Sequence, residues 1–204
     1  PNKIASQLEG SKIFTKKMCK KYNIPTAKFG IFKNFKSAIN FLDSSVFPIV
    51  IKADGLASGK GVYISENKEE AIQAVKEIFD GKFGKPEQIL IEEFLDGEEM
   101  SYFIISDGKC YKKFQTAQDH KRVFEGDKGK NTGGMGAYSP SKLIDDNLDD
   151  KIIKKIIEPT LKGLKELGVS YEGFLYAGLM IKNGEPYLIE YNVRMGDPEC
   201  QTIL

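Results

Sequence analysis

The residues best suited to chemistry lie near the C-terminal end of the sequence, in the run Glu190-Tyr-Asn-Val-Arg-Met-Gly-Asp-Pro-Glu199. Glu190 and Asn192 are two positions apart, so on a strand their side chains share one face of the sheet. Both carry the hard oxygen ligands that Mg²⁺ prefers beside nucleotide phosphates. Arg194 follows two residues later and is expected to point to the same place. A solvated strand end that runs into a turn is the alternative interpretation.

A second cluster contains scarce residue types. The basic residues are almost all lysine, and the sequence has only two arginines, Arg122 and Arg194, and one histidine, His120. A guanidinium is a planar, forked donor for phosphate or carboxylate, so an arginine in a lysine-rich chain indicates such a site, unless its placement is chance. The run 118–122 precedes the loop Asn-Thr-Gly-Gly-Met-Gly at 131–136, whose backbone N–H groups suit a small anionic substrate. We interpret His120 as a contact, because a lone histidine is usually structural.

A glycine-rich segment, Lys52-Ala-Asp-Gly-Leu-Ala-Ser-Gly-Lys-Gly61, resembles a phosphate-binding P-loop but departs from it. The glycine spacing is one residue short, Gly61 replaces the required Ser or Thr, and a strand follows instead of a helix. We therefore predict a hairpin flap whose N–H groups fold over phosphates while Lys52 and Lys60 supply positive charge. An ordinary hairpin turn at a solvated edge is the alternative.

An acidic segment, Glu-Glu-Phe-Leu-Asp-Gly-Glu-Glu at 92–99, ends an apolar strand. A strand edge offers a free N–H and C=O pair to an adenine ring, and Phe94 and Leu95 provide an apolar environment. Glu99 can accept hydrogen bonds from the two ribose hydroxyls. A solvated acidic turn is the commoner interpretation, and the motif gains weight from its position after the glycine-rich segment.

Hydrophobic periodicity predicts the elements that must position these groups. Hairpins outnumber crossovers, so we predict an α+β fold with antiparallel sheets. Pro159 should kink the strongest helix, and the polar segment 119–140 should be loop. Helices are expected after a Ser11 cap up to Asn23, around 38–42, and over 67–79 and 150–167. Strands are expected over 48–53, 61–65, 88–94, 100–106, 109–115, 174–181 and 186–191.

Length and composition exclude several classes. The 204 residues, 41% of them hydrophobic, favour one compact unit over two independent domains. The 30 Lys and Arg are interspersed with 29 Asp and Glu, which argues against a nucleic-acid partner. No segment approaches about 18 consecutive apolar residues and no leader is recognisable, so no membrane or secretory role is expected.

The cysteines and the chain ends add two expectations. Cys19, Cys110 and Cys200 form no Cys-x-x-Cys or Cys/His cluster, which argues against a zinc site or a disulfide framework and favours a reducing, cytoplasmic location. The sequence starts at Pro1 and stops soon after its richest polar motif. We therefore expect it to be a piece of a longer protein.

Taken in order, these motifs resemble the ATP-grasp family, and within it the ligases that join glycine to 5-phosphoribosylamine in purine biosynthesis. The segments that carry the resemblance are 51–57, 92–99, 118–122, 131–140 and 192–199. The last two are specific to these ligases, whereas the first two are shared more widely. The resemblance implies that the glycine carboxylate attacks the γ-phosphate of ATP, and that the amine then displaces phosphate from glycyl phosphate to give glycinamide ribonucleotide. Catalysis would be mostly positioning and charge neutralisation, with Mg²⁺ or Mn²⁺ as the metal.

The resemblance also implies a role for individual residues. Phosphates are held by Lys52, Gly59, Lys60 and Gly61, and the transferring phosphoryl group by Arg194. Adenine is held by Glu92, Glu93, Phe94 and Leu95, ribose by Glu99, and the metal by Glu190 and Asn192. The substrate contacts are Asp119, His120, Lys121, Arg122, Asn131, Thr132, Gly133, Gly134, Asp197 and Pro198. The catalytic group is expected to comprise Lys52, Asp119, Lys121, Arg122 and Arg194.

Domain organisation and rival functions complete the expectations. The resemblance implies a small lid lobe over 26–95, a larger lobe over 1–25 and 96–204, and N- and C-terminal domains outside this chain, without which we expect little activity. The penultimate strand, 174–181, lacks the further metal carboxylate of many ATP-grasp enzymes. The alternatives are another ATP-grasp carboxylate–amine ligase or a non-catalytic adenine-nucleotide-binding module. A kinase-like protein is disfavoured, because Lys52 precedes the glycine loop and the kinase motifs are absent.

Overall fold

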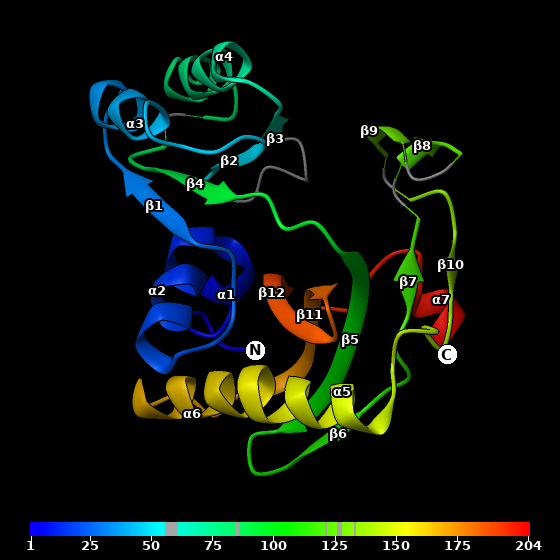
Figure 1. Cartoon of the computed structure of the whole chain (residues 1–204). Coiled ribbons are helices and arrows are strands. Elements are labelled where there is room, and N and C mark those ends of the chain that lie inside the picture. Colours follow the sequence, from blue (N-terminus) through cyan, green and yellow to red (C-terminus); the bar gives the residue numbers. More distant parts are fainter. Residues whose placement is uncertain (56–60, 85, 121, 126–127, 133) are drawn as a thin grey trace.

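The computed structural model describes residues 1–55, 61–84, 86–120, 122–125, 128–132 and 134–204 (Figure 1). Two four-stranded sheets dominate the chain, one above the other in Figure 1, and each carries its own helices. Every pairing between named strands is antiparallel, so the predicted α+β class is confirmed. No helix in the described part of the chain is both long and apolar enough to cross a membrane.

The upper sheet has the strand order β1-β4-β2-β3. Its strands are β1 (Phe29–Phe32), β2 (Ile49–Ala53), β3 (Val62–Ser65) and β4 (Ile89–Glu93). Helices α3 (Phe35–Leu42) and α4 (Lys68–Phe79) pack on one face, where Ile51, Ile91 and Val75 are fully buried. Both helices begin at an asparagine whose side chain accepts a backbone N–H three residues on, Asn34 and Asn67. The two predicted helices and the β2–β3 hairpin are therefore confirmed.

The lower sheet has the order β12-β11-β5-β6. Its strands are β5 (Glu98–Asp107), β6 (Tyr111–Lys113), β11 (Glu172–Lys182) and β12 (Glu185–Asn192). Asn183 and Gly184 both have positive φ, as the two-residue turn between β11 and β12 requires. Helices α1 (Gln7–Gly10), α2 (Lys12–Tyr22), α5 (Asp146–Ile152) and α6 (Glu158–Glu166) share one buried apolar core with this sheet. Ser11 caps α2, as predicted, by accepting the Phe14 N–H.

Two stretches of chain join the sheets. One runs from α2 to β1 and lies against β12, where Leu188 N donates to Pro25 O at 2.8 Å. The other is the connector 94–97 between β4 and β5, which crosses from the upper to the lower sheet in Figure 1. One cluster of buried apolar residues lies within 38–91, and another combines 5–24 with 100–191. The lobe boundaries at 26 and 95 stay a prediction, which these separate cores support.

The strongest predicted helix is longer and less regular than its periodicity indicates. It starts at Asp146, four residues early, because Asp145 caps it by accepting the Leu148 N–H. A π-helical turn, η1 (Ile153–Ile157), separates α5 from α6, and Glu158 N–H bonds the Ile153 carbonyl five residues back. Pro159 has no N–H to continue the α-helical ladder, so the disturbance expected there takes the form of a π turn.

The prediction that 119–140 is loop is wrong in part. Four short strands occur there: β7 (Gln118–Asp119), β8 (Arg122–Phe124), β9 (Lys128–Asn131) and β10 (Ala137–Tyr138). They form two ribbons: β7 with β10, beside the lower sheet in Figure 1, and β8 with β9, which lies above that ribbon at about the level of the upper sheet. These strands are polar and too short for the alternation that marks a strand in a sequence. The C-terminal helix α7 (Glu199–Ile203) was not predicted either.

Candidate functional site

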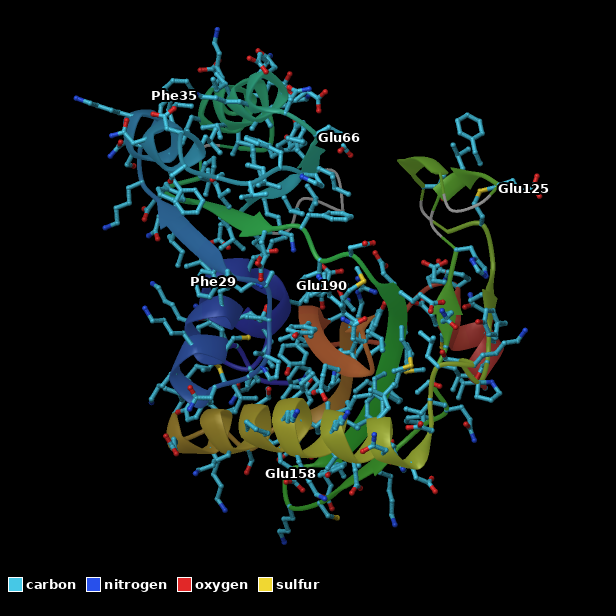
Figure 2. The ribbon with its side chains drawn as sticks, in the orientation of Figure 1. Phe29, Phe35, Glu66, Glu125, Glu158 and Glu190 are labelled. Carbon is cyan, nitrogen blue, oxygen red and sulfur yellow. The ribbon has the colours of Figure 1, made fainter. Side chains whose placement is uncertain are left out.

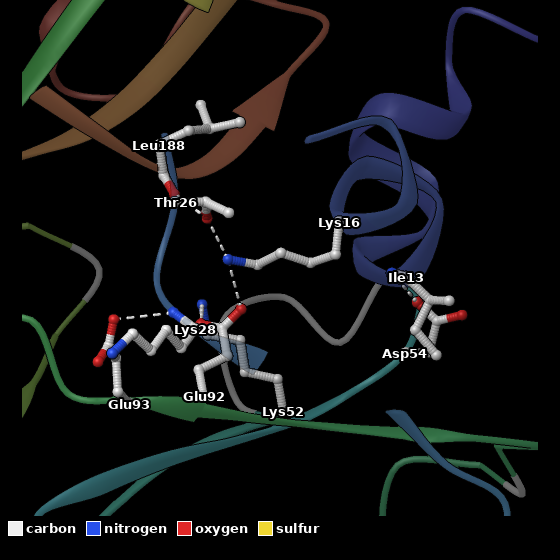
Figure 3. Close-up of polar contacts among 9 residues, drawn as sticks. All are labelled: Ile13, Lys16, Thr26, Lys28, Lys52, Asp54, Glu92, Glu93 and Leu188. Carbon is white, nitrogen blue, oxygen red and sulfur yellow. Dashed lines mark hydrogen bonds and ion pairs between the residues drawn. The ribbon is translucent and has the colours of Figure 1, made fainter. Parts of the chain in front are cut away.

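A buried carboxylate lies between two lysines where the upper and lower parts of the molecule meet (Figure 3). The Glu92 side chain, 4% exposed, forms two ion pairs, with Oε1 2.7 Å from Lys16 Nζ and Oε2 2.8 Å from Lys52 Nζ. Lys52 and Glu92 share the face of the sheet opposite α3 and α4, because Glu92 pairs with Val50 in register. Lys16 comes from α2 and also donates to Thr26 Oγ1.

Burial and pairing set the charges of this cluster. Burial is the largest single influence on Lys52 and lowers its pKa, but the combined attraction of Glu92, Glu190 and Glu99 outweighs burial and raises the pKa. Burial likewise disfavours the Glu92 carboxylate, yet Lys52 and Lys16 hold its pKa below the ordinary value. Burial lowers the Lys16 pKa against the pull of Glu92. With Lys52 and Glu92 both ionised at neutral pH, the ammonium group of Lys52 is a fixed cation near the end of β2, which suits a phosphate group.

Both carboxylate oxygens of Glu92 are paired with lysines, which bears on the adenine contact expected for this residue. Sequence reasoning assigns Glu92 to adenine, whereas the structure shows its side chain holding Lys52 and Lys16. The adenine contact stays a prediction. The neighbouring Glu93 is exposed, and its Oε1 accepts the Lys28 N–H at 2.9 Å.

Lys12 is a candidate functional residue that sequence reasoning missed. Its Nζ donates to Gly55 O at 2.9 Å, at the start of the glycine-rich segment. Burial lowers its pKa, and the opposing attraction of Glu190 places it within electrostatic reach of the last strand. Beside it, Ser11 Oγ donates to the Asp54 carboxylate. The Ile13 backbone N–H donates to the same carboxylate (Figure 3). Lys12 is identified by its contact with Gly55, 43 positions away, and no motif in the sequence points to it.

The glycine-rich flap is described only at its two ends. Ala53 N donates to Gly61 O at 2.8 Å, which closes the β2–β3 hairpin. Gly59 and Lys60 lie outside the described residues, so their predicted phosphate contacts stay predictions.

The β4–β5 connector lies beside the lysine cluster. Phe94 and Leu95 are half-buried, and Glu99, at the start of β5, is exposed. The attraction of Glu99 raises the pKa of Lys52, after those of Glu92 and Glu190. A Cβ on Gly97 would lie 2.5 Å from Ile181 O, so the connector follows β11 closely. The structure thus brings the predicted adenosine segment next to the predicted phosphate lysine.

The predicted metal ligands lie at the end of β12, and Figure 2 places Glu190 in the region between the two sheets. Tyr191 between them is buried in the core of the lower sheet, so Glu190 and Asn192 turn to the other face. Arg194 Nη2 donates to Asn192 Oδ1 at 3.2 Å, and Arg194 Nε pairs with Glu9 Oε1 at 3.0 Å.

These donors fit Mg²⁺ as one part of its coordination shell. They are one carboxylate and one amide oxygen, and Mg²⁺ usually takes one or two such ligands and completes its shell with phosphate oxygens and water. No group of three or more acidic, His or Cys side chains that could hold a metal occurs among the residues that the structure describes. A metal bound here would therefore need a phosphate ligand as well.

The predicted substrate residues come together from three segments. Gly134 has φ +120°, and a Cβ there would lie 2.9 Å from Pro198 Cδ and 3.3 Å from Asp119 Oδ1. Thr132 Oγ1 accepts the Gly134 N–H at 3.1 Å. The exposed ring of His120 stacks on Tyr138, consistent with a contact role.

For the other predicted substrate residues the structure gives fewer contacts or none. Arg122 and Asn131 pair across the β8–β9 ribbon through their backbones. Asp197 is exposed and accepts from Gln201 Nε2 at 3.3 Å. Lys121 and Gly133 lie outside the described residues.

Glu199 is a second residue whose role sequence reasoning missed. Its carboxylate is 2% exposed and accepts hydrogen bonds from Ser101 Oγ at 3.1 Å and Tyr176 OH at 3.0 Å. It packs against Gly196, where a Cβ would overlap it. The carboxylate thereby anchors the turn that carries Asp197 and Pro198 to strands β5 and β11.

A sequence profile of the family described as "Phosphoribosylglycinamide synthetase, ATP-grasp (A) domain" matches residues 10–200. The chain belongs to this family. It is 51% identical over 205 residues to the phosphoribosylamine–glycine ligase of Mesorhizobium japonicum, and the match covers all of this chain and 48% of that protein. The chain thus spans about half the length of the curated relatives it matches.

Solved structures show the same fold. The phosphoribosylamine–glycine ligase of Thermotoga maritima superposes with a TM-score of 0.93 at 41% identity, over all of this chain and 52% of the other. The D-alanine–D-alanine ligase of Bacillus anthracis, solved in complex with ATP, gives a TM-score of 0.70 at 21% identity, over all of this chain and 60% of the other. At that identity the likeness shows the ATP-grasp fold alone.

Proposed function

We propose that this chain is the ATP-binding part of a cytoplasmic ligase that joins glycine to 5-phosphoribosylamine, using ATP and Mg²⁺, in purine biosynthesis. The observation that carries the proposal is the fixed Lys52 cation, which buried Glu92 holds at 2.8 Å and whose charge Glu190 also favours. The 51% identity to a named ligase over the whole chain supports the choice of substrates.

In the proposed reaction a glycine carboxylate oxygen bonds to the γ-phosphorus while the bond from that phosphorus to the leaving ADP oxygen breaks. The amine nitrogen of phosphoribosylamine then attacks the acyl carbon, phosphate leaves with the former carboxylate oxygen, and the nitrogen loses a proton. Both steps depend on holding anionic groups close together, so fixed positive charge is the main contribution of the protein.

In this proposal each group of residues at the candidate site has its own role. Lys52 and Lys12 bind phosphate oxygens, and the connector 94–97 with Glu99 binds the adenosine half. Arg194 orients the transferring phosphoryl group. Glu190 and Asn192 would hold Mg²⁺, which when bound neutralises charge on the phosphate oxygens. Asp119, Gly134 and Pro198 form the wall against which the amine substrate binds.

A coupled assay for ADP release tests the function in the full-length protein. We expect ADP formation that requires glycine and phosphoribosylamine together, and glycinamide ribonucleotide as the product by mass spectrometry. Turnover with a different carboxylate and amine would identify another ATP-grasp ligase. ATP binding by calorimetry with no turnover on any pair would identify a nucleotide-binding module. Either result would reject the proposal.

A further inference from the structure

Glu9, on α1, holds the segment that follows β12 through two separate bonds. Its Oε2 accepts the Val193 backbone N–H at 2.9 Å, and its Oε1 accepts Arg194 Nε at 3.0 Å. The Glu9 side chain is only 16% exposed, whereas that of Arg194 is 59% exposed. A long, exposed arginine has many rotamers open to it, so a partner that is itself fixed determines its direction.

The second partner of Arg194 shows what that direction is. Arg194 Nη2 donates to Asn192 Oδ1 at 3.2 Å, and Nη1 donates to the Met195 carbonyl oxygen at 3.1 Å. With Nε on Glu9, each nitrogen of the planar group therefore has a partner, and Nη2 is turned toward the strand end that carries the predicted metal ligands. Lysine has no two donors in this geometry, which accounts for one of the two arginines in a lysine-rich chain.

The same short segment also contacts the glycine-rich strand end. Ser11 Oγ and Ile13 N donate to Asp54, and Lys12 Nζ donates to Gly55 O. Residues 9–13 therefore hold both the Arg194 segment and the start of the phosphate flap. Figure 1 shows this junction of α1 and α2 beside β12 and below the upper sheet.

We propose that Glu9 is a positioning residue of the ligase: it directs Arg194 toward Asn192 and the phosphoryl group without touching substrate itself. The inference rests on the proposed function. Glu9 lies outside every motif of the sequence, and only its contacts with Val193 and Arg194 point to it.

Glu9→Gln separates this role from a structural one. Glutamine retains an oxygen for the Val193 N–H, but its neutral amide removes the ionic bond to Arg194. Arg194 is 59% exposed and keeps its hydration, and glutamine keeps the Val193 bond, so we expect the melting temperature of the full-length protein to fall far less than in Glu92→Gln, whose lysines are buried. We expect kcat to fall by about 10- to 100-fold, as when a residue that orients a metal ligand is lost, with KM for ATP nearly unchanged.

A double-mutant cycle with Arg194→Ala makes the test specific. If Glu9 acts through Arg194, Glu9→Gln lowers kcat no further when Arg194 is already alanine. Glu166→Gln is the matched control, since that carboxylate also pairs with a basic side chain, Lys21, but lies on α6, and we expect wild-type kcat. Additive losses, an unchanged kcat in Glu9→Gln, or a raised kcat would overturn the proposal, the last because Glu9 would then compete with phosphate for Arg194.

A spectroscopic measurement keeps this inference separate from the proposed function. The Arg194 Nε–H signal of the ¹⁵N-labelled full-length protein is assigned by its loss in Arg194→Ala. We expect Glu9→Gln to shift this signal and speed its exchange with water, whether or not the protein turns over glycine. An unmoved signal rejects the role of Glu9, whereas a shifted signal in a protein without glycine-dependent ADP release rejects the proposed function alone.

Discussion

Two cations of the candidate site, Lys52 and Arg194, are each paired with a glutamate, but one pair is buried and the other is partly exposed. Lys52 and its partner Glu92 are 7% and 4% exposed, with Lys16 completing a buried cluster. Arg194 is 59% exposed and its partner Glu9 16%. Loss of a partner inside the protein leaves a charge without solvation, whereas the exposed arginine keeps its water. From this comparison we expect Glu92 to stabilise the fold as well as the site, whereas the proposed role of Glu9 is to direct Arg194.

The largest effect is expected for Glu92→Gln. It leaves Lys16 and Lys52 buried without a counter-charge, and removal of one partner of a buried ion pair typically costs about 3–5 kcal/mol. We therefore expect strong destabilisation in urea unfolding of the full-length protein. Glu93→Gln is the matched control on the same strand, because it retains an acceptor for the Lys28 N–H and is exposed. Equal stability of the two variants would break the comparison.

The pH dependence of that stability difference sharpens the same point. The Glu92 pKa is below 4.5 in the folded state, so its contribution is fully present above the unfolded value of 4.5 and is lost as the pH falls through the folded pKa. We expect the difference in unfolding free energy between wild type and Glu92→Gln to be constant from pH 6 to 7 and to shrink below about pH 4.5. A difference that grows on acidification would contradict the assigned charge state.

Glu190→Gln should show the opposite balance, a large effect on turnover and a small one on the fold. Glu190 is half-buried, and losing an electrostatic contribution at a reacting phosphate typically costs on the order of 100-fold in kcat. We expect this loss with ATP affinity less affected, measured by ADP release across a range of Mg²⁺ concentrations. Glu185→Gln, on the same strand but paired with Lys151 and Lys155, is the control. Normal turnover at limiting Mg²⁺ would place the metal elsewhere.

Glu99→Ala should weaken ATP binding by about 1–3 kcal/mol, the usual loss when a charged group no longer accepts hydrogen bonds. Glu99 is exposed at the start of β5, so the fold should not change. Calorimetric titration with ATP measures the effect, and the adjacent Glu98→Ala serves as control. Unchanged affinity in Glu99→Ala would remove this residue from the ribose site.

The sequence predicts those elements whose signals are local. Helix α4 is predicted well because its apolar positions follow one face and Asn67 caps it. The β11–β12 hairpin is predicted because Asn-Gly determines the turn. The β7–β10 and β8–β9 ribbons were missed, since their pairing depends on neighbours across the fold and not on alternation within a strand.

The candidate site shows the same contrast between residues with a local signal in the sequence and residues identified only by contacts across the fold. Lys52, Glu190 and Asn192 are predicted from motifs in which the chemistry lies within a few residues, and their roles stay predictions. Glu9 and Lys12 were missed, because Glu9 contacts Val193 from 184 positions away and Lys12 contacts Gly55 from 43 positions away. The burial of Glu92 between two lysines could not be predicted from the sequence either. Periodicity predicts the helix that contains Lys16 but gives no sign of its contact with Glu92.

The smallest effect on stability is expected for an ion pair in which both side chains are exposed. Such a pair gives the baseline against which the buried Glu92 cluster is compared. Asp150 and Lys154 pair at 2.8 Å one turn apart on the long helix, with both side chains more than 60% exposed. Solvent screens such a pair, so Asp150→Asn should leave the melting temperature unchanged within error. The adjacent Asp149 is 17% exposed and accepts the hydroxyl of buried Tyr102 at 2.8 Å. Asp149→Asn should therefore lower the melting temperature measurably, because that hydroxyl would then bond a neutral, weaker acceptor. Thermal unfolding of both variants gives the contrast, and a larger loss in Asp150→Asn would show that burial does not decide which ion pairs stabilise this protein.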